Sequence, residues 1–145
     1  MSLEPGLFRI RAIAPPEILP EYATREEGNT SVLALPLITP PDTNQEWEAS
    51  LFPDGEWTIT APGGGGWGRH KDAPGEDVLF TDTVKHWIIT PNEDGGCVIS
   101  IKATGYRDGA ILAVTVEDGN LVINSYPLGP GVRLPAWRFI KIDRD

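Results

Sequence analysis

Short runs of alternating apolar and polar residues, or of β-branched residues, recur along the chain between turn-forming residues. The clearest runs are residues 7–11, 32–35, 57–60, 98–101 and 121–124. A two-residue period places successive side chains on opposite faces of a strand. The chain also carries 14 prolines and 16 glycines, which leave few windows long enough for a helix. The pattern therefore predicts an all-β protein built from short strands.

The runs fall into three units that are similar to one another. Each unit opens with a glycine and an alternating strand, at residues 6–12, 55–61 and 96–103. Second strands are predicted at residues 21–24, 66–69 and 112–114, and third strands at 32–37, 78–81 and 121–125. Each unit closes on a strand that contains a tryptophan, at residues 45–49, 85–89 and 135–139. Three units of four strands predict a single β-trefoil domain over residues 1–145, with repeats at about 6–54, 55–94 and 95–142.

The recurring tryptophans are Trp47, Trp87 and Trp137. Because a buried tryptophan removes a large apolar surface from water, we expect all three in the core. A sandwich of seven or eight strands would lack this periodic placement of glycine and tryptophan, so the repeat favours the trefoil.

Length and charge narrow the classes of partner. A chain of 145 residues can bury roughly two thirds of the surface that it exposes when unfolded. Its net charge of −9 repels phosphates and anionic membranes, which argues against nucleic acid and membrane partners. Residues 1–6 show no basic segment followed by an apolar run, and no apolar stretch approaches ~18 residues. We therefore expect a cytoplasmic protein, and a monomer.

Few side chains are suited to catalysis or metal binding. Cys97 is the only cysteine, so an internal disulfide is impossible, and its spacing from His70 and His86 fits no recognised zinc site. Cys97 lies in the middle of a predicted strand, where a thiol behaves as a small apolar group. The sequence thus predicts no enzyme, no metal and no cofactor.

A run of four glycines at residues 63–66 is similar to a phosphate-binding loop only superficially. Neither a Lys-Ser or Lys-Thr pair nor a helix follows it. The run instead predicts a flexible hairpin loop. Trp67, directly after the run, is either an exposed contact residue or a packing residue at a strand edge.

One tripeptide suggests carbohydrate binding. Gln45, Glu46 and Trp47 match the Gln-x-Trp pattern of ricin-type trefoil lectins. The equivalent positions in the other two repeats carry Lys85 and Pro135 in place of the glutamine, and a single cysteine cannot form the disulfides usual in those lectins. A carbohydrate-binding lectin therefore stays as an alternative.

Two connections, residues 13–20 and 38–45, each contain a pair of adjacent prolines. Proline restricts φ and so lowers the conformational entropy that a loop loses on binding. Ile18 and Leu19 lie between prolines in the first connection and are suited to enter an apolar pocket of a protein partner. The alternative is a pair of stiff connections in which Ile18 or Leu19 covers the end of the barrel.

Residues 1–4, 6–12, 21–24 and 135–139 together resemble the mycocypin family, the clitocypin-like protease inhibitors of mushrooms. The resemblance implies a β-trefoil inhibitor of papain-like cysteine proteases, in which the two proline-containing loops enter the V-shaped cleft and cover the catalytic cysteine. The first loop is shorter than in the family and carries Ile18 and Leu19 where the family is rich in glycine. The implied protease-binding residues are Pro15, Pro16, Glu17, Ile18, Leu19, Pro20, Thr39, Pro40, Pro41, Asp42, Thr43 and Asn44.

The resemblance also raises two other protease classes. Family members inhibit asparaginyl endopeptidase through an asparagine in a loop that here spans residues 61–67 and contains none, so this activity is expected to be missing. Related trefoils inhibit trypsin-like serine proteases through a basic residue, for which Arg25 and Arg133 are the candidates. Acidic neighbours count against Arg25, and an arginine beside the Pro-Ala-Trp segment of the family implies a structural role for Arg133.

Overall fold

The computed structural model of the chain describes residues 3–13, 19–39, 43–92, 95–102 and 109–142. These residues form strands and a single 3₁₀ turn, which confirms the all-β prediction. No helix in the described ranges is long and apolar enough to cross a membrane. The elements are β1 (Gly6–Ala12), β2 (Tyr22–Thr24), β3 (Leu33–Leu35), η1 (Thr43–Gln45), β4 (Trp47–Leu51), β5 (Trp57–Thr60), β6 (Gly66–Gly68), β7 (Leu79–Thr81), β8 (Ile88–Pro91), β9 (Cys97–Ile101), β10 (Ala110–Glu117), β11 (Asn120–Pro127) and β12 (Trp137–Lys141).

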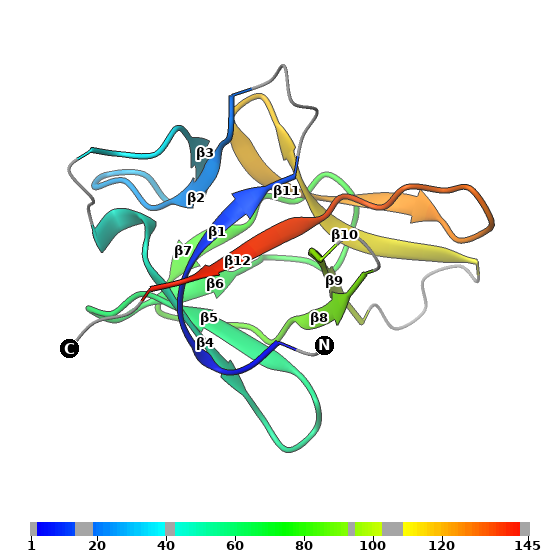
Figure 1. Cartoon of the computed structure of the whole chain (residues 1–145), viewed down its shortest axis with the longest axis horizontal. Coiled ribbons are helices and arrows are strands. Elements are labelled where there is room, and N and C mark those ends of the chain that lie inside the picture. The colour runs from blue at the N-terminus through cyan, green and yellow to red at the C-terminus, as the bar shows by residue number, and fades with distance from the viewer. Residues whose placement is uncertain (1–2, 14–18, 40–42, 93–94, 103–108, 143–145) are drawn as a thin grey trace.

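The first and last strands of each repeat form a closed antiparallel barrel. The ring runs β1, β4, β5, β8, β9, β12 and back to β1. Figure 1 shows β1 in blue beside β12 in red, the pair that closes the ring. Between β5 and β8, the backbone N–H groups of Trp57 and Trp87 each donate to the other residue's carbonyl at 2.7 Å. Closure of the ring leaves no barrel strand with a free edge.

The remaining strands form three hairpins, β2–β3, β6–β7 and β10–β11, that cover one end of the barrel. A ring of backbone hydrogen bonds joins them around the threefold axis. Val32 N–H donates to the Val78 carbonyl, Val78 N–H to Leu121, and Leu121 N–H back to Val32, each at 2.9 Å. A barrel with three hairpins related in this way is a β-trefoil, as the repeat predicts.

The predicted core positions of the three closing tryptophans are confirmed, because all three are fully buried. Each indole N–H donates to a carbonyl in the second strand of its own repeat. Trp47 donates to Ala23 at 2.9 Å, Trp87 to Trp67 at 3.2 Å, and Trp137 to Val114 at 3.0 Å. The tryptophans therefore satisfy their polar atom inside the core, which removes the cost of burying it.

Trp67 is fully buried, so its interpretation as an exposed contact residue is wrong. Its ring packs edge-on against Trp47 and Trp87, with centroid distances of 5.8 and 6.0 Å. The flanking glycines make this possible by allowing close backbone approach. A Cβ on Gly66 would lie 2.5 Å from the Ile59 carbonyl oxygen, and one on Gly68 would lie 2.7 Å from that of Thr83.

The strands of the third repeat are longer than the sequence pattern suggests. β10 and β11 each extend well past the predicted residues 112–114 and 121–125, and pair from Ala110↔Pro127 to Glu117↔Asn120. A two-residue turn joins them, in which Asp118 and Gly119 have φ values of 52° and 80°. An Asp-Gly pair with both φ values positive matches the twist of a hairpin, which accounts for the long continuous pairing.

Candidate functional site

The β1–β2 connection ends next to the position at which the β3–β4 connection begins. The first connection ends where β2 begins at Tyr22, and the second begins where β3 ends at Leu35. These two residues are paired across the β2–β3 hairpin. The described ends of the two proline-containing loops are therefore neighbours at the same end of one hairpin (Figure 1).

The base of the β1–β2 loop is held by backbone hydrogen bonds. Ala12 N–H donates to the Glu21 carbonyl at 2.9 Å, and Ile13 N–H donates to Ala136 at 3.0 Å. Ile13 also packs closely on Gly96, because a Cβ there would lie 2.4 Å from its Cδ1. The loop is thus anchored to the residues that directly precede β2, β9 and β12.

Leu19 and Pro20 are the predicted site residues of the first loop that the structure describes, and both are exposed. Leu19 is 75% exposed, the highest value among the exposed large apolar side chains of the described residues. Its interpretation as a side chain that covers the barrel end is therefore wrong. Pro15, Pro16, Glu17 and Ile18 lie outside the described residues.

The β3–β4 loop is braced by the buried side chain of Gln45, which is 1% exposed. Its Oε1 accepts the Ile38 N–H at 2.9 Å. Its Nε2 donates to the Pro36 carbonyl at 2.9 Å and to Thr24 Oγ1 at 3.0 Å. One amide therefore ties both ends of this loop to β2. Gln45 faces the protein interior, so it offers no polar group to a sugar on the surface.

The other predicted residues of the β3–β4 loop divide into described and undescribed positions. Thr39 and Thr43 are exposed and Asn44 is half-buried, while Pro40, Pro41 and Asp42 lie outside the described residues. Leu37, which the sequence analysis placed at the end of a strand, lies beyond β3 and is 41% exposed. Its position in the alternating pattern gave no signal that it would face solvent.

A buried ion pair lies behind these loops. Arg9 Nη2 in β1 is 3.9 Å from Glu46 Oε2, and the Glu46 side chain is almost fully buried. The Glu46 N–H donates to the Thr43 carbonyl at 3.0 Å, which closes η1. Because removal of one member would leave the other charge without its buried partner, this pair holds β1 and the end of the β3–β4 loop in one geometry.

The two candidate reactive arginines differ in environment. Arg25 is half-buried, lies 5.7 Å from the centroid of the Phe80 ring, and donates to the Thr43 carbonyl at 3.4 Å. Arg69 occupies the equivalent place in the second repeat, 4.8 Å from the Trp87 ring, and donates to His86 at 2.9 Å. These contacts give Arg25 a structural role, whereas Arg133 is exposed.

The glycine run between β5 and β6 forms the predicted hairpin loop. Ala61 N–H donates to the Gly65 carbonyl at 2.8 Å, and Gly64 N–H donates to Ala61 at 3.0 Å. Gly63 and Gly64 are exposed and carry no side chain. The tip of this loop therefore presents only backbone to a partner, and Pro62 beside it is the exposed side chain of the loop.

Cys97 is buried in β9, and burial raises the pKa of its thiol. A raised pKa lowers the thiolate fraction at neutral pH, so this side chain is a poor nucleophile.

One cluster that the sequence analysis missed lies at the β4–β5 turn. His86 Nδ1 is 3.8 Å from Asp54 Oδ2 and 3.6 Å from Glu56 Oε1. The antiparallel pairing of Trp57 with Trp87 places Glu56 and His86 on the same face of the two strands, and this pairing could not be read from the sequence.

Comparisons with known proteins agree with this geometry. A family model described as the peptidase inhibitor clitocypin matches residues 6–139. Clitocypin-2 from Clitocybe nebularis is 31% identical over 97% of this chain and 98% of the relative. Clitocypin-4/-3 from the same organism is 32% identical over the same shares. Among solved structures, a Macrolepiota procera ricin B-like lectin in complex with lactose superposes with a TM-score of 0.68 over 98% of this chain and 100% of the lectin. At 14% identity, that likeness concerns the fold.

Proposed function

Since the chain belongs to the clitocypin family of peptidase inhibitors, we propose that it inhibits papain-like cysteine proteases by placing its β1–β2 and β3–β4 loops in the active-site cleft. The observation that carries this proposal is the pairing of Tyr22 with Leu35, which makes the two loops neighbours. Two loops that leave from one point can enter a cleft together from one side.

Exposed apolar side chains supply the anchors of this interface. Leu19 and Leu37 project from the described parts of the two loops, one from each. An interface of the usual protease–inhibitor size buries about 800 Å² on each partner, and a few central side chains provide most of the binding energy. Both leucines lie within a few residues of the proline pairs, so we expect them inside the buried area.

The inhibition needs no reactive group. Cys97 is buried, and the buried side chains of Gln45 and Glu46 contact the loop base and Arg9. The brace contributes to affinity indirectly, because a loop that is already held in its bound shape loses less entropy on association. We therefore expect reversible, competitive inhibition.

The direct test compares Leu19→Asp with wild type in a papain inhibition assay. A buried aspartate would lose the apolar contact and face an uncompensated desolvation cost. We expect the inhibition constant to rise at least about tenfold, equivalent to about 1.4 kcal/mol, with no change in melting temperature because Leu19 is exposed in the free protein.

Leu128→Asp is the matched control, since Leu128 is 54% exposed in the β11–β12 connection and should leave inhibition unchanged. The proposal is wrong if the wild-type protein leaves papain-like enzymes fully active at micromolar concentration. It is equally wrong if a variant with both proline-containing loops replaced by glycine-serine linkers inhibits as well as wild type.

A further inference from the structure

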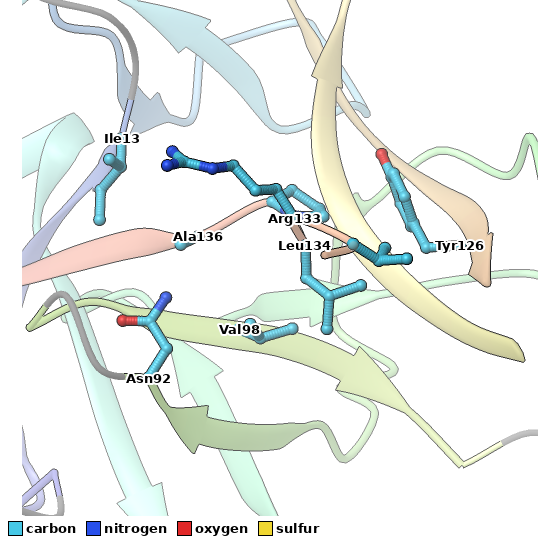
Figure 2. Close-up of a pocket in the computed structure, with 9 residues that line it drawn as sticks. Ile13, Asn92, Val98, Tyr126, Arg133, Leu134 and Ala136 are labelled. Carbon is cyan, nitrogen blue, oxygen red and sulfur yellow. The ribbon is translucent and has the colours of Figure 1, made fainter. Parts of the chain in front are cut away.

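A cleft of about 570 Å³ lies beside the segment that leads into β12. Figure 2 shows the residues that line it, which come from the positions just after β1 and β8, from β9, from β11 and from residues 132–136. The paired register between β12 and β9 begins only at Trp137↔Cys97. Pro135 has no N–H to donate to a neighbouring strand, so the chain before Trp137 separates from β9 and leaves this space. The volume falls within the range of small-molecule sites, roughly 300–1,000 Å³.

Apolar side chains form most of the walls. Leu134 points toward Val98 in Figure 2, and Ile13 and Ala136 lie at the other end of the cleft. Ile13 is 39% exposed although it is a large apolar residue. A ligand with an apolar body would cover these side chains and remove their surface from water.

Three polar side chains surround the apolar walls. The side chain of Arg133 extends along the cleft toward Ile13 in Figure 2. Within the described ranges, Arg133 forms no ion pair and no hydrogen bond through its side chain. Asn92 lies at the lower edge, where its Oδ1 accepts the Gly96 N–H at 3.0 Å and so holds the amide in place. Tyr126 lies on the side of the cleft opposite Ile13.

We propose that this cleft binds a small organic carboxylate with an apolar body. A guanidinium presents parallel N–H donors that match the two oxygens of a carboxylate, and Arg133 has these donors free of other described partners. The net charge of −9 makes the rest of the surface unfavourable for anions, so the charge of Arg133 distinguishes this cleft from other apolar patches. Leu134, Val98 and Ala136 then contact the hydrocarbon part of the ligand.

The test uses three probes and isothermal titration calorimetry with the full chain. Octanoate carries both features of the proposed ligand, acetate carries only the carboxylate, and octylamine carries the same hydrocarbon chain with the opposite charge. We expect saturable binding of octanoate at one site, and binding at least about tenfold weaker for each of the other two. Equal affinity for octanoate and octylamine would overturn the proposal, and so would a failure of octanoate to saturate in the millimolar range.

Two variants locate the site. Arg133→Glu reverses the charge at an exposed position and should weaken octanoate binding at least about tenfold. Lys71→Glu makes the same charge change at an exposed residue that does not line the cleft, and should leave the affinity unchanged. Backbone amide NMR shifts on octanoate addition should concentrate at Ile13, Val98 and Tyr126. Unchanged affinity in Arg133→Glu, or shifts confined to other residues, would contradict the assignment whatever the protease assay shows.

Discussion

The first and second repeats use the same hydrogen bonds around different side chains. In both, the closing tryptophan donates to the carbonyl of a residue in the second strand of its repeat. Two residues after that acceptor, an arginine lies over an aromatic ring. The second strands themselves differ. β2 reads Tyr22-Ala23-Thr24 with a small residue at its centre, whereas β6 reads Gly66-Trp67-Gly68 with the largest residue there. The backbone arrangement therefore tolerates opposite ways of filling the core.

The loops of the two repeats diverge further. The first repeat has the exposed Leu19 before β2 and the bracing Gln45 before β4. The second repeat has glycines before β6 and an exposed Lys85 at the position equivalent to Gln45. The comparison teaches that the features suited to binding a partner are concentrated in one repeat, while the other carries the aromatic centre of the core.

The largest expected effect is on stability, in Trp67→Ala. Removal of a fully buried indole loses its apolar burial and leaves a cavity between Trp47 and Trp87, which costs about 4 kcal/mol in the free energy of unfolding. Urea denaturation measures this loss. Papain inhibition by the folded fraction should stay unchanged, because Trp67 lies in the core and not in the loops. A loss below about 1 kcal/mol would show that the core does not depend on this residue.

An intermediate effect is expected for Gln45→Leu, which removes the brace of the β3–β4 loop. The part-buried Ile38 N–H and Pro36 carbonyl lose their partner, and unsatisfied buried polar groups cost about 1–3 kcal/mol. We expect a lower free energy of unfolding by about 2 kcal/mol together with weaker papain inhibition. Lys85→Leu, at the equivalent position of the second repeat, should change neither quantity. Equal effects of the two substitutions would remove the distinction between the repeats.

The smallest expected effect is that the protein does not inhibit asparaginyl endopeptidase. The tip of the β5–β6 loop consists of Gly63 and Gly64, so it offers no side chain to the specificity pocket of asparaginyl endopeptidase. We expect the purified protein to leave that enzyme active under conditions in which papain is inhibited. Potent inhibition of both enzymes would show that another part of the surface binds asparaginyl endopeptidase.

Most of the fold could be predicted from the sequence because strand alternation and turn residues are local signals. The opening strand at residues 6–12 agrees with β1 at both ends, and the closing tryptophans lie in the core as expected. The length of β10 and β11 was underestimated, although the Asp118-Gly119 pair is itself a local hairpin signal. The candidate site was predicted less completely, since Leu37 continues the alternation of β3, although Pro36 is a local signal that the strand ends at Leu35.

The sequence by itself determined the number and order of strands, the threefold repeat, the two proline-containing loops and the family resemblance, because each of these can be recognised from the residue types of short segments without knowing how the segments contact one another. Only the tertiary structure decided that Trp67 is buried between two other tryptophans, that Gln45 faces inward and that Arg133 and Ile13 border one cleft. Each of those outcomes depends on backbones that approach one another from distant parts of the chain. The close contacts of Gly66 and Gly96 show how such approaches are set by the packing of the whole barrel, which no local pattern encodes.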